Sequence, residues 1–466
     1  MNKAADPFEP PIPPHHTSGP NIDLQAVLRG DSVPPPATLL ERSDYVMPVV
    51  PIPTARYTDP AYHELEVKHM WSRVWQVAAW SFDMPNPGDT IVYRNVGQSA
   101  VLVRQKDGSI KAFENSCPHR GIELCADDAN LRHIRCPYHA FTWSIEGECR
   151  WLPTEWDFPQ FDRKNFPLRQ VRCEMWNGFV FVNFDDNAKP LLEYMGKMVD
   201  QWKSWDFTTS RYRGVTAIVK CKTNWKSGMD AFLETMHVSA THPQAIQFAA
   251  DTASQYDVWP DEPHFSRFHS MTGFVSDNSL DPMAAQDGFD VFTSMYLPEA
   301  FGNTDGELLP GETIREGIAR LTRKTYKERM NIDTTNVSEA ELVDGNEYLL
   351  FPNFVIWPSW SNPIFYRFRP GNGPDESIWE ISLFVPYEGE RPPSGPVIEL
   401  PEGGKLADVP GFEYLGYLLD QDVANFPQIQ NGMKANRSGV LHLARYSDQR
   451  IRHYHETLER YIQGTI

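Results

Sequence analysis

The sequence lacks the features of a membrane-spanning, secreted or nucleic-acid-binding protein. No stretch approaches the ~18 apolar residues that a membrane-spanning helix needs. The first residues lead into prolines instead of an apolar segment, so we expect no secretory signal. The 43 lysines and arginines are outnumbered by 62 acidic residues, and the formal charge of -19 repels nucleic-acid phosphates. We therefore expect a soluble, cytoplasmic protein that binds neither membranes nor nucleic acid.

Cysteine is also scarce, with six in 466 residues. Four of them show no regular disulfide spacing, which is typical of a reducing compartment: Cys125, Cys149, Cys173 and Cys221. The chain shows no flavin or nicotinamide fingerprint. Its length is sufficient for two or three domains, and a hydrophobic content of 41% is ordinary for a protein with a sizeable core.

Proline is concentrated at the start of the chain. Residues 1–55 contain so many prolines that regular helix or central strand is excluded, because proline fixes φ and removes a backbone donor. We expect an extended arm that is either disordered or wrapped on another subunit. Asp59 and Pro60 then have the residue types of a helix N-cap and first position. The following helix should run to about Trp75, so residues 56–79 are expected to pack with the catalytic domain.

The rest of the chain changes character once. Residues 80–185 form short alternating runs separated by glycine and aspartate turn signals, which predicts an all-β domain. Residues 186–466 combine strands and helices, which predicts an α+β domain with an antiparallel sheet. Its expected strands lie at 214–220, 348–350, 353–357 and 378–384, and its expected helices begin near 224 and cover 314–330 and the C-terminal end.

The β region contains two ligand hooks. Cys117-x-His119 is followed by Arg-Gly, and Cys136-x-x-His139 lies in a second loop. Zinc accepts two cysteines and two histidines in tetrahedral geometry. A Rieske-type [2Fe–2S] cluster accepts the same set, with both cysteines on one iron and both histidines on the other. The first hook is unlike the Cys-x-x-Cys or His-x-x-x-His hooks of most zinc sites, and this favours the cluster.

These loops resemble the Rieske domain of the Rieske non-heme iron oxygenases, in the alpha (catalytic) subunit of the ring-hydroxylating type. Respiratory Rieske proteins carry an extra cysteine in each loop, whereas Ile122 and Tyr138 occupy those positions here. The resemblance implies a low-potential [2Fe–2S] cluster and a helix-grip fold for the catalytic domain.

A second set of metal-ligating residues follows Asn224. On a helix, Asp230, Glu234 and His237 would lie on nearly one face, because steps of four and three residues return to the same side. His242 precedes Pro243, which pushes it out of the α region, so the helix should end before it. Two histidines and one carboxylate leave open positions on non-heme Fe(II).

This spacing resembles the mononuclear-iron segment of the same family. The resemblance implies that His237 and His242 are iron ligands and that Glu234 is a catalytic carboxylate and not a ligand. Asp230 is a second candidate for a catalytic carboxylate. Glu234 would instead bridge His237 to the cluster ligand His139 of a neighbouring subunit. Many family members have aspartate at the bridge, so glutamate is a departure.

The third iron ligand must come from another part of the chain. Residues 419–430 resemble the family's late helix that supplies an aspartate. We favour Asp422, with Asn425 and Gln430 at the matching offsets, and keep Asp420 as the alternative.

The resemblance implies a homotrimer in which one subunit's cluster lies beside its neighbour's iron, with or without beta subunits. A ferredoxin, a reductase or both would deliver electrons from NAD(P)H. The expected reaction is cis-dihydroxylation of an aromatic compound. The alternatives are a monooxygenase, an O- or N-demethylase, or a non-catalytic electron carrier. The aromatic residues of segment 351–368 fit a substrate pocket, although sheet core is the more common role for such residues.

Overall fold

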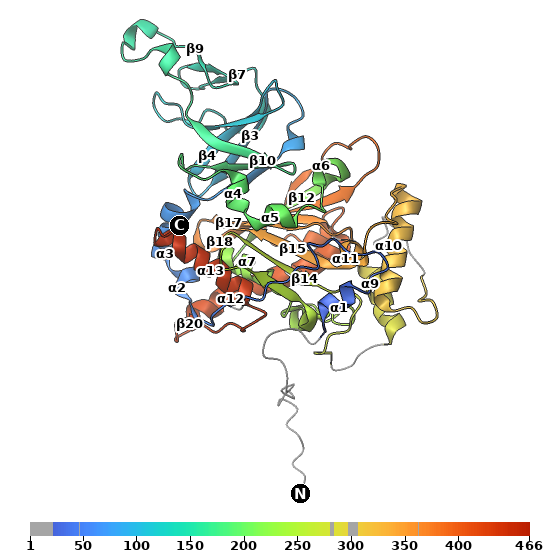
Figure 1. Cartoon of the computed structure of the whole chain (residues 1–466). Helices are drawn as coiled ribbons and strands as arrows, with labels where there is room; N and C mark the ends of the chain where they lie inside the picture. The colour runs from blue at the N-terminus through green and yellow to red at the C-terminus, as the bar shows by residue number, and fades with distance from the viewer. Residues whose placement is uncertain (1–21, 46, 280–283, 297–305, 362) are drawn as a thin grey trace.

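The computed structural model of the chain describes residues 22–45, 47–279, 284–296, 306–361 and 363–466. A β domain lies against a larger domain of sheet and helices (Figure 1). The predicted fold class, an all-β domain followed by an α+β domain with an antiparallel sheet, is confirmed. None of the described helices is long and apolar enough to cross a membrane.

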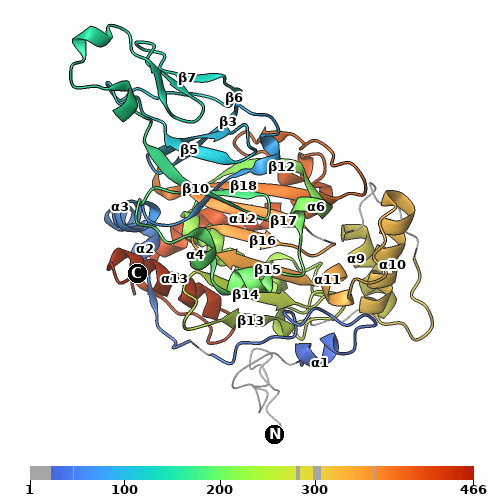
Figure 2. The ribbon, with the colours of Figure 1, turned by 45° about the horizontal axis from the view of Figure 1, so that its top comes forward.

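The β domain is built on a seven-stranded sheet with the order β2-β11-β10-β5-β4-β3-β6. A small sheet, β7-β8-β9, lies at the end of this domain farthest from the large domain (Figures 1 and 2). The strands are β2 Gln76–Trp80, β3 Asp89–Asn95, β4 Gln98–Arg104, β5 Ile110–Glu114, β6 Ala129–Asn130, β7 His133–Arg135, β8 Thr142–Ser144, β9 Cys149–Trp151, β10 Gln170–Trp176 and β11 Phe179–Asn183.

The strand β4, inside this sheet, is buried on both faces. Along β4, Val101 and Val103 pack into one apolar cluster, while Ala100 and Leu102 pack into another on the opposite face. Side chains of a strand alternate between faces, so an uninterrupted apolar run is what a strand buried on both sides requires. The first of these clusters also contains Cys117 of the ligand loops, so the core of the domain supports those loops directly.

The larger domain has an eight-stranded sheet with the order β13-β14-β15-β16-β17-β18-β12-β19. Figure 2 shows β18 to β13 following one another across the domain. Neighbours pair antiparallel except β12 and β19, which pair parallel. The strands are β12 Arg211–Cys221, β13 Gln255–Val258, β14 Phe265–Ser270, β15 Gly345–Leu350, β16 Phe354–Trp357, β17 Ile364–Gly371, β18 Gly373–Pro386 and β19 Val397–Glu399.

Helices cover one face and one end of this sheet. The helix α7 (Trp225–Ala231) packs on β17 and β18, and α12 (Glu413–Ala435) packs on α7. The expected helix 314–330 is confirmed as α10 (Ile314–Met330), which begins with a capping box between Thr313 and Glu316. The remaining helices are α4 Leu191–Met195, α5 Lys197–Gln201, α6 Phe207–Ser210, α8 Val238–Thr241, α9 Ala285–Tyr296, α11 Glu339–Val343 and α13 Gln449–Ile462.

The N-terminal segment differs from the expected arm. Its residues before 22 lie outside the described part of the chain. Residues 22–45 and 47–55 lie along the large domain of their own chain, where Gln25 donates to Gln255 at 2.9 Å. The short strand β1 (Ile52–Pro53) pairs with β20 (Val440–Leu441). A five-residue helix, α1 (Leu24–Leu28), forms there because this stretch contains no proline and Asp23 caps it.

The helix expected after Asp59 is present in a modified form. Asp59 accepts a hydrogen bond from the backbone N–H of Ala61 at 2.8 Å, and Pro60 opens α3 (Pro60–Glu66), as predicted. The helix continues as the wider π-helical turn η1 (Val67–Trp71) instead of running regularly to Trp75. The short helix α2 (Ala55–Thr58) precedes it.

Candidate metal centres

The two ligand loops of the β domain have the same backbone geometry. In loop 117–122 the first residue donates its N–H to the carbonyl of the sixth at 2.8 Å, and loop 136–141 repeats this bond at 2.8 Å. The fifth residue of each loop donates back to the first and has positive φ, 77° at Gly121 and 61° at Ala140. The two loops therefore present their cysteines in an equivalent way, whereas the histidine is the third residue of the first loop and the fourth residue of the second.

The four side chains converge as two pairs. Cys117 and Cys136 are both 2% exposed and share a side-chain hydrogen bond. The rings of His119 and His139 lie 4.7 Å apart and are half-buried. Among the described residues, none donates to or accepts from the buried Nδ1 of His119. Two cysteine sulfurs beside two imidazole rings, with a ring nitrogen of His119 free to bind metal, fit a [2Fe–2S] cluster of the Rieske type.

Aromatic rings enclose the histidine side of this centre. Phe141 stacks on His119 at 4.8 Å, and Phe158 meets the same ring edge-on at 5.5 Å. Burial raises the pKa of Cys117 to about 11, against hydrogen bonding from the His119 backbone that lowers it. The Cys117 thiol is therefore neutral without metal, and a bound metal must displace its proton.

The iron-binding segment does not form the single helix that the spacing predicted. The helix α7 ends at Ala231, and turns carry Glu234 to His237, where the short helix α8 begins. Tertiary contacts hold the turn between the two helices, because the Thr235 hydroxyl bonds Tyr256 and Ser254 at 2.8 Å each. The expected end of the helix before His242 is confirmed.

His237, His242 and Asp422 meet at one point. Their ligand atoms all lie within 4.8 Å of one another. The Oδ1 of Asp422 lies 3.2 Å from Nε2 of His242 and 3.8 Å from Nε2 of His237. Asp420 lies elsewhere and accepts the backbone N–H groups of Leu406 and Ala407 at 2.8 and 3.2 Å. The structure thus brings Asp422, and not the alternative Asp420, to the histidine pair.

A second residue orients each histidine. Glu234 accepts from the ring Nδ1 of His237 at 2.8 Å and from its backbone N–H at 3.0 Å. Gln421 lies 2.8 Å from Nδ1 of His242. Holding Nδ1 leaves Nε2 free to bind metal and makes each ring a stronger ligand. Sequence reasoning missed Gln421, although its position beside Asp422 on α12 was a usable signal.

The electrostatics of His237 favour its charged form in the absence of metal. Burial lowers its pKa, but the hydrogen bond and charge of Glu234 and the charges of Asp422 and Asp251 raise it more, so the net pKa lies above the usual value of 6.5. A divalent cation would take the place of that proton.

Asp230 does not join this group. It accepts a hydrogen bond from the Tyr57 hydroxyl at 2.6 Å and lies 3.5 Å from His455. The expectation that it shares a helical face with Glu234 is wrong, because α7 ends between them. Asn425 and Gln430 position α12 through hydrogen bonds. Asn425 donates to the Thr241 hydroxyl at 3.1 Å, and Gln430 accepts from the backbone N–H of Asn224 at 2.9 Å.

A cavity of about 160 Å³ opens beside the histidines and Asp422. Its aromatic lining residues are Phe232, Phe248, Phe268, Phe292, Trp357 and Tyr366. Of the described aromatic residues of segment 351–368, Trp357 and Tyr366 line the cavity, while Phe365 and Phe368 belong to the sheet core. The wall also contains the carboxylates Asp251 and Asp344, which the sequence did not point to.

Comparison with known proteins identifies both domains. Residues 74–162 match the family model described as "Rieske [2Fe-2S] domain", and residues 200–464 match "Ring hydroxylating alpha subunit (catalytic domain)". The second match covers more than half of the chain. The first match contains the four hook residues, and the second contains His237, His242 and Asp422.

Curated relatives are similar over part of their length. The chain is 28% identical over 235 residues to the carnitine monooxygenase oxygenase subunit of Acinetobacter pittii, covering 49% of this chain and 63% of that protein. It is 31% identical over 204 residues to the Escherichia coli K12 protein of the same name (41% and 52%). It is 31% identical over 195 residues to benzene 1,2-dioxygenase subunit alpha of Pseudomonas putida (40% and 42%). The chain thus spans about half the length of these relatives.

Solved structures share the fold. A quaternary ammonium Rieske monooxygenase in complex with L-carnitine superposes with a TM-score of 0.62 at 17% identity, covering 89% of this chain and 96% of that one. A naphthalene 1,2-dioxygenase mutant bound to phenanthrene gives 0.63 at 17% identity, covering 89% and 92%. At this identity the likeness extends to the fold alone.

Proposed function

The chain belongs to the ring-hydroxylating oxygenase alpha subunits, and on that premise we propose that it is the terminal oxygenase of a Rieske-type system that activates O₂ and hydroxylates an organic substrate. The observation that carries the proposal is the convergence of His237, His242 and Asp422 beside an aromatic-lined cavity. The same proposal divides the chain into an arm (1–55), a helical segment (56–79), a cluster domain (80–185) and a catalytic domain (186–466).

The donor sets fit the two metal groups that the family implies. Cys117, His119, Cys136 and His139 would hold the [2Fe–2S] cluster. His237, His242 and Asp422 would hold a mononuclear Fe(II), since two histidines and one carboxylate on one face are the set that non-heme iron oxygenases use. When bound, the cluster supplies single electrons and the iron supplies open positions for O₂.

Glu234 has two roles in this proposal. Within its own chain it fixes the ring of His237 through the 2.8 Å contact. Across a subunit boundary it would also accept from His139 of a neighbouring copy, in a homotrimer. Support comes from the surface position of the site: Met236, between Glu234 and His237, is 44% exposed.

Two reactions suit the cavity. Cis-dihydroxylation of an aromatic ring places both oxygen atoms on the substrate, and the aromatic wall supports it. Monooxygenation, including O- or N-demethylation, places one oxygen atom on a C–H carbon and releases the other as water. The likeness to carnitine monooxygenase oxygenase subunits supports this second candidate. Both reactions use two external electrons, which a cytoplasmic ferredoxin, reductase or both would bring from NAD(P)H, with or without beta subunits in the assembly.

Metal analysis of two matched variants tests the proposal. The purified protein should contain about three iron and about two acid-labile sulfide per chain, with the visible spectrum of a Rieske cluster. Asp422→Asn should lose about one iron and keep the spectrum, because it removes a ligand of the mononuclear site only. Asp420→Asn, two positions away, should keep all the iron. Equal iron content in the two variants, or no substrate-dependent O₂ consumption with a reductase, would overturn the proposal.

A further inference from the structure

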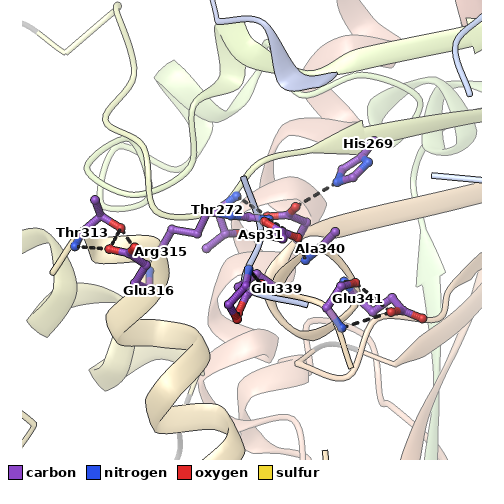
Figure 3. A network of polar contacts seen from close by, with 12 residues as sticks. Asp31, His269, Thr272, Thr313, Arg315, Glu316, Glu339, Ala340 and Glu341 are labelled. Carbon is purple, nitrogen blue, oxygen red and sulfur yellow. Dashed lines mark hydrogen bonds and ion pairs between the residues drawn. The ribbon is translucent and has the colours of Figure 1, made fainter. Parts of the chain in front are cut away.

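Besides Glu234, which contacts His237, two carboxylates in the cavity wall lie outside the set that would hold iron, and one of them, Asp344, has an arginine partner. Asp344 lies 2.9 Å from Nε2 of His269, makes a close ion pair with Arg315 and accepts the Thr272 N–H at 3.0 Å. Arg315 also pairs with Asp31 of the N-terminal segment at 3.0 Å (Figure 3). Asp344 therefore belongs to an ion-paired structural network that ties this segment to the wall.

The other wall carboxylate, Asp251, has no cationic partner. It is 4% exposed, and among the described residues its carboxylate accepts from neutral donors, the hydroxyl of Ser276 and the amide of Asn278 at 2.9 Å. No lysine, arginine or histidine among the described residues forms an ion pair with it. A buried charge is normally paired, because two hydrogen bonds replace only part of its hydration.

Iron does not supply the missing partner. The two charges of Fe(II) are matched by Asp422 as ligand and Glu234 on His237. The negative charge of Asp251 then has no counter-charge from the iron. It lies close enough to His237 to help raise the pKa of that ring, as Glu234 and Asp422 do. Within the described part of the chain, no lysine or arginine lines the cavity.

We infer that the substrate of this site carries a cationic nitrogen, with no anionic group, and that Asp251 is the residue that selects it. The inference rests on the proposed function and names its substrate class. A substituted ammonium group would pair with Asp251 and pack against ring faces such as Phe248 and Phe292, since aromatic faces attract cations. The size agrees, because an engineered cavity of about 150 Å³ holds a benzene-sized molecule.

The test compares three probes of nearly one shape on the iron-loaded enzyme by isothermal titration calorimetry. Choline is cationic, 3,3-dimethylbutan-1-ol is its neutral carbon isostere, and 3,3-dimethylbutanoate is anionic. Choline should bind at least ~10-fold more tightly than the alcohol, a difference of about 1.4 kcal/mol. The anion should bind most weakly.

Variants assign the preference to Asp251. Asp251→Asn should bring choline and the alcohol within about 2-fold of each other, whereas Asp420→Asn, which removes an equal charge outside the cavity, should keep the preference. Choline that fails to bind, or binds wild type no more tightly than the alcohol, overturns the inference without any variant. In that case normal iron content and a reducible cluster leave the proposed function standing, whereas their loss would overturn that function instead.

Discussion

Glu234 and Gln421 make equivalent contacts with the two histidines, and this allows the proposed bridge to be tested against a matched control. Each lies 2.8 Å from the Nδ1 of its histidine, Glu234 on His237 and Gln421 on His242. Only Glu234 is charged, and only His237 lies beside the exposed Met236. We predict that Glu234→Gln and Gln421→Ala both weaken iron binding, but that only the first slows electron delivery between subunits.

The magnitude follows from the hydrogen bonds. The glutamine side chain keeps one acceptor oxygen, so Glu234→Gln loses one of the two bonds that the carboxylate accepts from His237. A hydrogen bond to a charged group contributes about 1.5–3 kcal/mol. Loss of a residue that orients a metal ligand costs roughly 10–100-fold in metal affinity, which is about 1.4–2.7 kcal/mol. The two estimates agree, and iron affinity should fall by about that factor.

The assay loads both variants to the same iron occupancy and follows a single turnover after the cluster has been reduced. Gln421→Ala should then form product at the wild-type rate, because its side chain orients a ligand but is not on the proposed path. Glu234→Gln should form product far more slowly. Equal rates for the two iron-loaded variants would refute the bridge, and unchanged iron affinity in Glu234→Gln would refute the orienting role.

Three further predictions concern pH, a buried ion pair and a glycine. In the folded protein the pKa of His237 lies above its usual 6.5, because the carboxylates of Glu234 and its neighbours outweigh the effect of burial. Protonated His237 therefore stabilises the iron-free fold below about pH 6.5, and this stabilisation is lost as the pH rises through the folded pKa. Iron needs the neutral ring, so iron affinity measured by titration should rise from about pH 6 to about pH 8, and a flat profile would contradict the assignment. Lys226 and Glu66 form an ion pair at 2.5 Å, and both side chains are fully buried. Lys226→Met would leave the buried charge of Glu66 without its partner, so it should lower the free energy of unfolding, measured by urea denaturation, by about 3–5 kcal/mol. A loss below ~1 kcal/mol would show that the fold does not need the pair. Gly147 has a φ of +91°, and a Cβ there would meet a buried phenylalanine ring at 2.4 Å. Gly147→Ala should therefore lower the free energy of unfolding by about 1–3 kcal/mol more than Gly108→Ala, whose Cβ would meet nothing within 4 Å. Equal melting temperatures for the two variants would contradict this packing.

Local patterns predicted the parts of the sites that lie close together in the chain. The cysteine and histidine hooks are 19 residues apart from Cys117 to Cys136, and each is presented by one short loop whose conformation depends on nearby residues. The pair His237 and His242 was likewise readable, because Pro243 determines where the helix ends. The helix α10 agreed with its expected bounds because a capping box and an amphipathic pattern both specify it.

Long-range contacts overrode local patterns elsewhere. The spacing of Asp230, Glu234 and His237 fits a helix, but α7 ends at Ala231 and the Thr235 hydroxyl that follows bonds Tyr256 of β13 and Ser254. The N-terminal segment shows the same limit. Its prolines indicated an extended chain, and only the tertiary structure placed it against its own large domain, where Asp31 reaches Arg315.

Residue types and short spacings in the sequence by itself predicted the cysteine and histidine hooks of one metal centre, the histidine pair of the other, and the all-β and α+β domains. The resemblance favoured Asp422 and left Asp420 open, and the tertiary structure brings Asp422 to the histidine pair. Residues two apart on a helix point about 200° apart, so packing of α12 had to decide which one faces the histidines. The same holds for the cavity, because its wall, which includes Asp251, is assembled from segments that are distant in the chain.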